Sequence, residues 1–208
     1  MLTLYGYPKT RALRVTWMLE ELGAQYEYKL VKFGQNGFKS KKLLALNPAG
    51  KVPALVDGNL VLTESAAIVT YLGDKYQNAG LVPPAGTPER GKFSQWCYFA
   101  LTELEQPLWT IGKHKFALPE DKRVKEIFPT ATWEFQQALD LLSEGLGENP
   151  YILGDNFSAS DILIAHTLRW AINTGQSIQQ ANIKQYTDLV LSRGALKRAA
   201  DREESASS

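Results

Sequence analysis

Cysteine and histidine are scarce in this chain, which holds one Cys and two His among its 208 residues. A single thiol, Cys97, excludes an internal disulfide framework, and His114 and His166 are too few soft ligands for a zinc site. We therefore predict no bound metal. We also expect Cys97 to be a small buried hydrophobic residue, because nothing nearby in the sequence would lower its pKa.

An excess of one charge and long hydrophobic runs are absent as well. Lys and Arg number 23 against 22 Asp and Glu, for a net charge of +1, so nothing favours nucleic acid or an anionic membrane as a partner. No run approaches the ~20 apolar residues of a membrane span, and the start, MLTLYGYPKTRALR, lacks the hydrophobic core of a signal peptide. We expect a cytoplasmic protein.

The most informative stretch runs from Asn47 to Leu72, NPAGKVPALVDGNLVLTESAAIVTYL. Its Asn-Pro-Ala-Gly start must turn, because the residue before proline leaves the helical region and glycine accepts positive φ. VPALV and LVL read as strands around an Asp-Gly-Asn hairpin signal, and AAIVTYL has helical spacing. Glu64 and Ser65 therefore lie where a strand gives way to a helix, and a helix N-terminus is an anion site.

Pro53 is unexpected inside an apolar strand, because proline lacks the N–H that a ladder needs. We predict that the Val52-Pro53 bond is cis. The backbone N–H and C=O of Val52 would then face outward and pair with an extended peptide, whose carboxylate would lie at Ser65. The alternative is a tight turn that only shapes the sheet edge.

The first half of the chain reads β-α-β-α-β-β-α. MLTLYGY and YEYKLVKF are alternating strands on either side of the helix ALRVTWMLEELG, for which Thr10 is suited as the cap and Gly23 as the end. The β-α-β order implies parallel strands joined by a right-handed crossover. KSKKLLALNP is expected to form a short helix before the hairpin. This order is that of a thioredoxin-like domain, which we place at residues 1–77.

The second half reads as helices only. NAGLVPPAGTP has no periodicity and predicts a linker at 78–88, and residues 89–208 are predicted to form an all-helical domain. Its end, from Lys197 onward, is charged and then Ser-rich, and we expect it to be frayed. Ser158-Ala159-Ser160-Asp161 has the form of a capping box before an apolar helix, so we interpret Asp161 as structural.

The motifs N-P-x-G-x-V-P, the Asp-Gly hairpin and L-x-E-S-x-A-I-x-x-Y-L together resemble the glutathione-binding half of cytosolic glutathione transferases. The resemblance extends over most of the chain. Within the family, the chain resembles bacterial members of the Ser/Thr type. It implies the glutathione transferase architecture, an α/β thioredoxin-like N-terminal domain plus an all-α C-terminal domain. It also implies glutathione as co-substrate with no other cofactor, a small hydrophobic electrophile as second substrate, and a homodimer.

An enzyme of this family must convert the thiol of glutathione into the nucleophilic thiolate, and a hydroxyl that donates a hydrogen bond to sulfur favours the charged form. Aligning Pro8 and Arg14 with the P-G-S-x-x-x-R pattern of serine-type classes places Thr10 at their catalytic serine. Tyr5 matches the tyrosine-type register of animal enzymes. Tyr7 or a backbone N–H are the remaining alternatives, and Thr10 could also be a plain helix cap.

The resemblance also assigns the contacts of the tripeptide. Ser65 and its helix N-terminus would hold the γ-glutamyl carboxylate, and Glu64 would lie near the ammonium group. Val52, before Pro53, would pair with the cysteinyl backbone. Lys51 would approach the glycyl carboxylate, although a loop lysine is more often simply solvated.

The electrophile would dock against an apolar wall of the helical domain, for which Phe99, Trp109 and Phe116 are candidates, although aromatic residues at helical spacing are more often core. Two other functions stay open. A glutathione-dependent peroxidase or disulfide reductase would use the same tripeptide site. A non-catalytic glutathione transferase-like binding module is the third reading, against which the intact Glu64-Ser65 pair argues.

Overall fold

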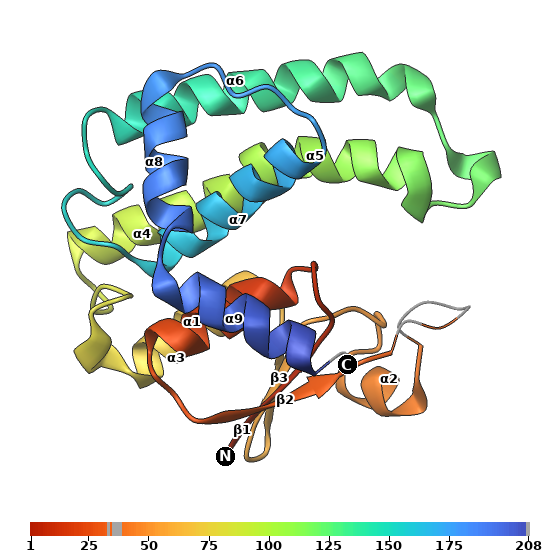
Figure 1. The fold of residues 1–208 in the computed structure, drawn as a ribbon, viewed down its shortest axis with the longest axis vertical. Coiled ribbons are helices and arrows are strands. Elements are labelled where there is room, and N and C mark those ends of the chain that lie inside the picture. The colour runs from red at the N-terminus through yellow and green to blue at the C-terminus, as the bar shows by residue number, and fades with distance from the viewer. Residues whose placement is uncertain (33, 35–38, 207–208) are drawn as a thin grey trace. The chain divides into compact units, whose positions relative to one another are not determined.

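The computed structural model describes residues 1–32, 34 and 39–206. The chain divides into two compact units, one of Met1–Val82 with Ser192–Ser208 and one of Pro83–Leu191. This division differs from the expected 1–77, 78–88 and 89–208 mainly at the C-terminal end, where the last helix packs with the first unit beside its first helix (Figure 1).

The first unit has the predicted thioredoxin-like order of elements. These are β1 (Leu2–Gly6), α1 (Ala12–Glu21), β2 (Tyr26–Leu30), α2 (Lys41–Leu46), β3 (Ala54–Asp57), β4 (Leu60–Thr63) and α3 (Ser65–Lys75). The strands form one mixed sheet in the order β2-β1-β3-β4, in which β1 and β2 are parallel and the other two pairs antiparallel. The predicted crossover and hairpin are thus confirmed; Phe33, at the end of the predicted second strand, lies outside the described residues.

The two faces of the sheet are covered by different helices. On the α1 face, Leu4 is fully buried and Gly6 allows a close approach, because a Cβ there would lie 2.9 Å from Cβ of Ala12 and 2.7 Å from the Tyr28 hydroxyl. On the other face, the ring of Tyr5 packs against a cluster that includes Leu43 of α2. The end of β1 therefore carries side chains toward both helices.

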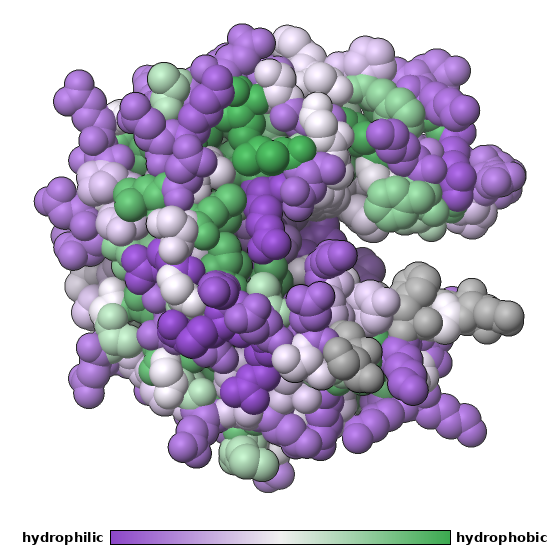
Figure 2. Space-filling view, viewed as in Figure 1, coloured by the Kyte–Doolittle hydropathy of each residue, from purple (hydrophilic) through white to green (hydrophobic). Residues whose placement is uncertain are grey.

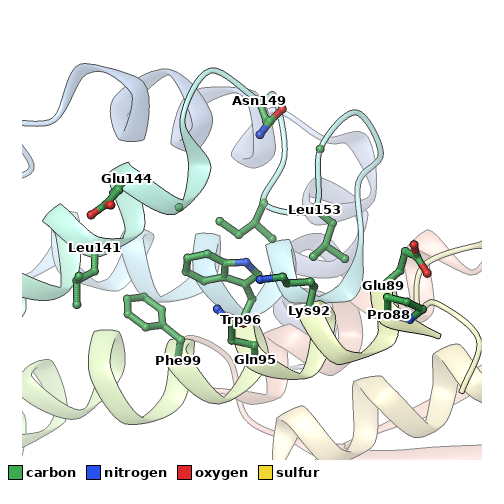
Figure 3. A pocket seen from close by; sticks show the side chains of 13 residues that line it. Pro88, Glu89, Lys92, Gln95, Trp96, Phe99, Leu141, Glu144, Asn149 and Leu153 are labelled. Atoms are coloured by element: carbon green, nitrogen blue, oxygen red, sulfur yellow. The ribbon is translucent and has the colours of Figure 1, made fainter. Parts of the chain in front are cut away.

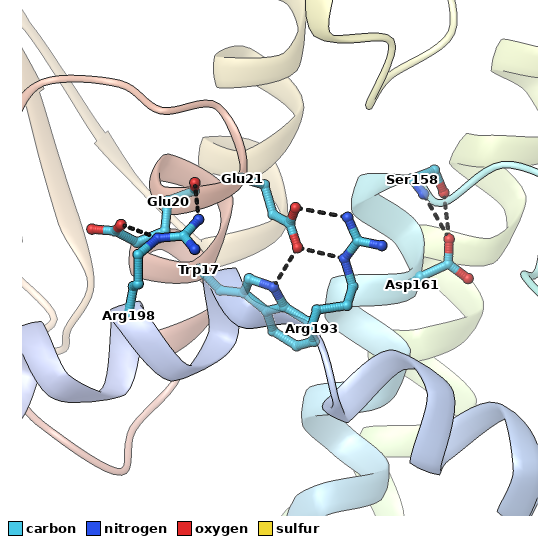
Figure 4. A network of polar contacts seen from close by, with 7 residues as sticks. All are labelled: Trp17, Glu20, Glu21, Ser158, Asp161, Arg193 and Arg198. Atoms are coloured by element: carbon cyan, nitrogen blue, oxygen red, sulfur yellow. Dashed lines mark hydrogen bonds and ion pairs between the residues drawn. The ribbon is translucent and has the colours of Figure 1, made fainter.

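Helix α9 (Gly194–Ser205) packs on α1, so the expectation of a frayed end is wrong for the residues described there. Arg193 donates to both carboxylate oxygens of Glu21 at 2.6 and 2.8 Å (Figure 4). Glu203 is buried and accepts a 2.7 Å hydrogen bond from the hydroxyl of Thr16. The charge at this end indicates solvation, but Glu203 and Arg198 are bonded to Thr16 and Glu20 of α1.

The second unit is all-helical, as predicted. Its α-helices are α4 (Pro88–Phe99), α5 (Glu105–Gly112), α6 (Phe128–Leu146), α7 (Ala159–Asn173) and α8 (Ala181–Leu191). Two π-helical segments, Ala100–Leu104 and Lys113–Ala117, follow α4 and α5 and keep the chain helical from 88 to 117. Helix α7 is buried on almost every side and is the centre of this unit. None of the helices in the described part of the chain is long and apolar enough to cross a membrane.

The predicted capping box at the start of α7 is confirmed. The Asp161 carboxylate is fully buried and accepts hydrogen bonds from the backbone N–H of Ser158 at 2.8 Å and its hydroxyl at 2.9 Å (Figure 4). Two further donors, the backbone N–H of Ile152 and the hydroxyl of Tyr186, reach its other oxygen, each at 2.9 Å. Burial raises the pKa of Asp161, and these four donors oppose that rise by favouring the carboxylate.

Hydrophilic side chains cover most of the face shown in Figure 2, and hydrophobic ones lie in smaller groups among them.

Candidate functional site

The turn from β4 into α3 places Ser65 at the first position of a helix. Ser65 is only 4% exposed, and Glu64 before it has φ 67° and ψ 111°, a conformation that side chains rarely adopt. Among the described residues other than glycine, only Lys9 shares a positive φ, and it directly precedes Thr10. Such strained backbone persists where the surrounding structure enforces it and clusters at functional sites.

Arg14 of α1 lies against this turn. It is fully buried, and its Nη1 donates a 3.2 Å hydrogen bond to Oγ of Ser65. The sequence alone uses Arg14 only as an alignment marker, and its place in the mostly apolar run ALRVTWML is the signal that points to its burial. A guanidinium beside the N-terminus of α3 adds positive potential where an anion would bind.

The segment before β3 carries a backbone that is not part of the sheet ladder. The Val52-Pro53 bond is cis, as predicted. Independently of that bond, the backbone of Val52 forms no hydrogen bond with any residue that the structure describes, because β3 begins only at Ala54. Its N–H and C=O are therefore available to pair with an extended ligand.

Asn47 fixes the loop that leads to this edge, a role the sequence did not reveal. Its side chain is 8% exposed, donates from Nδ2 to the carbonyl of Lys51 at 2.8 Å and accepts from the N–H of Ala49 at 3.1 Å. The side chain of Lys51 itself is exposed, with no ion pair or hydrogen bond among the described residues. The loop backbone is thus held while the lysine is left to solvent.

Thr10 lies in the turn between β1 and α1. Its hydroxyl donates to the carbonyl of Tyr7 at 2.6 Å and accepts from the N–H of Ala12 at 3.2 Å. It therefore binds a first-turn N–H of α1, although the helix cap itself falls on Arg11. To donate to a sulfur atom, the hydroxyl would have to rotate away from Tyr7. Tyr5, the other candidate, packs its ring on the α2 side, with Nζ of Lys42 5.4 Å from its centre.

The three aromatic candidates of the second unit are not gathered around one cavity. Phe99 lines a pocket of about 820 Å³ between α4 and the end of α6, beside Trp96 (Figure 3). The rings of Phe99 and Trp96 pack edge to face, with their centroids 5.2 Å apart. Gly145 leaves space for the ring of Trp96, since a Cβ on residue 145 would lie 2.2 Å from a ring atom. The ring centroid of Trp109 instead lies 6.5 Å from that of Trp170, and Phe116 is 66% exposed. Neither Trp109 nor Phe116 lines this pocket.

Comparison with known proteins identifies the family. Residues 1–74 match the family described as glutathione S-transferase, N-terminal domain, and residues 131–196 match glutathione S-transferase, C-terminal domain. The chain is 31% identical over 169 residues to glutathione S-transferase F9 of Arabidopsis thaliana, covering 78% of this chain and 77% of that protein. The chain belongs to the glutathione S-transferase family. Its fold is the expected glutathione transferase architecture.

Two further likenesses bear on this glutathione S-transferase. It is 30% identical to the disulfide-bond oxidoreductase YfcG of Escherichia coli, over 78% of this chain and 76% of that one. A solved glutathione transferase from Burkholderia graminis, with two glutathione molecules bound per subunit, is 29% identical with a TM-score of 0.84, covering 96% of this chain and 87% of that one. Members of the family use glutathione itself as co-substrate, without a metal or prosthetic group. No cluster of three or more metal-ligating side chains occurs in the described part of this chain.

Proposed function

We propose that this glutathione S-transferase binds glutathione along the edge before β3 and at the N-terminus of α3, and stabilises its thiolate for attack on a small hydrophobic electrophile. The observation that carries the proposal is the buried hydroxyl of Ser65 at a helix N-terminus, next to the guanidinium of Arg14. A hydroxyl, helix N–H groups and a nearby cation form a site for a carboxylate.

Each part of the tripeptide then has a partner. Ser65 and the first N–H groups of α3 hold the γ-glutamyl carboxylate, and Glu64 lies near the ammonium group. The unpaired backbone of Val52, next to Pro53, pairs with the cysteinyl residue as an added strand would. Lys51, exposed at the end of the loop, approaches the glycyl carboxylate. This arrangement directs the cysteinyl sulfur toward the turn that carries Thr10.

The chemistry requires the sulfur to lose its proton. A free thiol has a pKa of about 8.5, and each unit of depression corresponds to about 1.4 kcal/mol. The hydroxyl of Thr10 accepts an N–H from Ala12, which polarises the hydroxyl and makes it a stronger donor to sulfur once it turns from Tyr7. The thiolate attacks the electrophile, a carbon–sulfur bond forms, and the leaving group departs with its electron pair. Tyr5, Tyr7 and a backbone N–H are the other candidate donors.

The second substrate and the assembly belong to the second unit in this proposal. Phe99, Trp109 and Phe116 are separate candidates for an apolar surface that receives the electrophile, and of the three it is Phe99 that lines the pocket described above. A homodimer is proposed from membership of the family. A cytoplasmic location follows for an enzyme that uses reduced glutathione.

Binding is tested by calorimetry with glutathione. Ser65→Ala should raise the Kd about 10- to 100-fold, because a hydrogen bond to a charged group contributes roughly 1.5–3 kcal/mol. Ser177→Ala, at an exposed serine of the second unit, is the matched control and should leave the Kd unchanged. Wild-type protein that binds no glutathione at millimolar concentration would contradict the proposal.

The thiol donor is tested separately, with 1-chloro-2,4-dinitrobenzene as the electrophile. Thr10→Ala should lower turnover about 10-fold or more and raise the pKa of bound glutathione, followed by the ultraviolet absorbance of the thiolate, while the Kd changes little. Thr10→Ser should restore both. Unchanged turnover in Thr10→Ala would transfer the role to Tyr5, Tyr7 or a backbone N–H.

A disulfide reductase is the second candidate, supported by the similarity to the disulfide-bond oxidoreductase and to the enzyme that holds two glutathione molecules per subunit. In that reaction the thiolate attacks a disulfide, one thiol leaves, and a second glutathione resolves the mixed disulfide as glutathione disulfide. Assays with a small disulfide, a peroxide and the aryl chloride on one preparation rank these activities. A non-catalytic binding module would leave the pKa of the bound thiol near that of free glutathione.

A further inference from the structure

Arg14 carries a permanent charge into the interior of the first unit. Its side chain is fully buried, and Nη1 lies 3.2 Å from Oγ of Ser65, across the contact between α1 and α3. Burying a guanidinium is costly, and a well-packed apolar side chain often serves stability as well or better. Ser65 is one partner of this buried charge, and it is the partner that lies at the N-terminus of a helix.

The hydrogen bond to Ser65 has a fixed direction. A guanidinium has donors only, whereas a hydroxyl has one donor and two acceptor positions, so Oγ of Ser65 must accept from Arg14. The hydroxyl proton then points elsewhere, and within the described residues it has no acceptor, although Ser65 is only 4% exposed. The strained backbone of Glu64 turns the chain so that this hydroxyl lies at the start of α3.

We propose that Arg14 is a positioning residue for the substrate: it holds the Ser65 hydroxyl as a donor toward the ligand and makes binding depend on a free α-carboxylate in the γ-glutamyl residue. The inference rests on the proposed glutathione site and deepens it. Without Arg14, the hydroxyl of Ser65 is free to rotate, and the site loses the cation that complements the carboxylate. Selectivity for γ-glutamyl peptides thus originates from a residue buried behind the residue that touches the ligand.

The test compares two ligands by calorimetry: glutathione, and an analogue with a γ-aminobutyryl group in place of the γ-glutamyl group, which lacks only the α-carboxylate. Arg14→Met, which keeps much of the side-chain volume, should weaken glutathione binding about 10-fold or more and change the Kd of the analogue little. Arg14→Lys, which retains the charge, should recover part of the loss. In Ser65→Ala protein, Arg14→Met should have a smaller effect on the Kd, since the two residues act together.

Thr16→Val is the matched control, because Thr16 is another fully buried polar residue of α1, bonded to Glu203 rather than to Ser65. It should lower the melting temperature without changing the preference for glutathione over the analogue. If Arg14→Met does not fold, Arg14→Lys alone must still reduce that preference.

Three outcomes would overturn the inference. In the first, the Arg14 variants keep the wild-type preference for glutathione; in the second, they lose affinity for both ligands equally; in the third, the effect of Arg14→Met on the Kd adds fully to that of Ser65→Ala. Each differs from failure of the proposed function, in which wild-type protein itself binds no glutathione.

Discussion

Asp161 in the second unit and Ser65 in the first are both buried in the first turn of a helix, yet their hydrogen bonds are completed in different ways. Asp161 accepts from four donors of its own unit, so both of its oxygens are satisfied by the chain. Ser65 accepts from Arg14, but its hydroxyl proton has no acceptor among the residues described. The completed hydrogen bonds of Asp161 suit a structural role, whereas the remaining donor of Ser65 suits the ligand contact proposed for it.

The backbone before each residue shows the same contrast. Ser158 caps α7 in an ordinary extended conformation, with φ −138° and ψ 170°, whereas Glu64 caps α3 with φ 67°. Strain of this kind costs about 1–3 kcal/mol and is expected only where the geometry serves a purpose. The buried polar groups at the start of α7 thus stabilise the second unit, whereas the first unit contains a strained backbone at its candidate site.

The strongest challenge to this contrast is Asp161→Ala. The substitution leaves buried donors of Ile152, Ser158 and Tyr186 without an acceptor, at about 1–3 kcal/mol each, so we expect a loss of at least 3 kcal/mol in unfolding free energy. Urea denaturation measures it. Asp188→Ala, at an exposed aspartate of α8, should change stability little. A loss of less than 1 kcal/mol in unfolding free energy would show that the hydrogen bonds of Asp161 do not stabilise the second unit.

Local sequence predicted much of this. The Asp-Gly hairpin, the cis proline and the capping box are all set by residues within a few positions of one another, so turn and cap chemistry is sufficient to find them. The Glu64-Ser65 step was placed at a helix start for the same reason, and α3 begins there.

Contacts between segments that are distant in the sequence could not be predicted from the sequence alone. Arg14 and Ser65 are 51 positions apart, and Thr16 and Glu203 are 187 apart, and no periodicity links such pairs. The same limit explains the expectation of a frayed end from Lys197 onward, because Arg198 and Glu203 find their partners on the distant helix α1. The orientation of the Thr10 hydroxyl is also a product of the folded turn, which places the carbonyl of Tyr7 within 2.6 Å.

Removing a single donor from the Asp161 network gives a smaller effect. In Tyr186→Phe one hydrogen bond to the carboxylate is lost while three remain, so we expect destabilisation of about 1–2 kcal/mol by urea denaturation. Tyr98→Phe, at a tyrosine that is 67% exposed, serves as the control. Equal stability of Tyr186→Phe and wild type would mean that the fourth donor is redundant.

Glu64→Gly probes the cost borne by the first unit. Glycine adopts positive φ without strain but is more flexible in the unfolded chain, so the net expectation is a gain of about 1 kcal/mol in stability. Affinity for glutathione should fall at the same time, because the carboxylate that we propose lies near the ammonium group is lost. Gly substitution at Glu89, an exposed residue in the first turn of α4, is the contrasting case and should destabilise. If the Glu64→Gly protein is less stable than wild type, backbone strain at Glu64 does not distinguish the first unit from the second.

The smallest expected effect is a change of stability with pH that depends on Cys97. The first unit is proposed to hold the thiolate of a ligand, whereas the second unit buries Cys97 as a neutral thiol. Burial raises the pKa of Cys97 to about 12, above the value of about 8.5 in an unfolded chain. Its contribution to stability is therefore complete below pH 8.5 and declines as the pH rises toward 12, since the unfolded chain releases this proton first. Between pH 7 and pH 9 the stability difference between wild type and Cys97→Ala should narrow by about 0.8 kcal/mol. A difference that stays constant over that range would show that this thiol ionises as readily in the folded unit as in the unfolded chain, and that burial does not disfavour its thiolate.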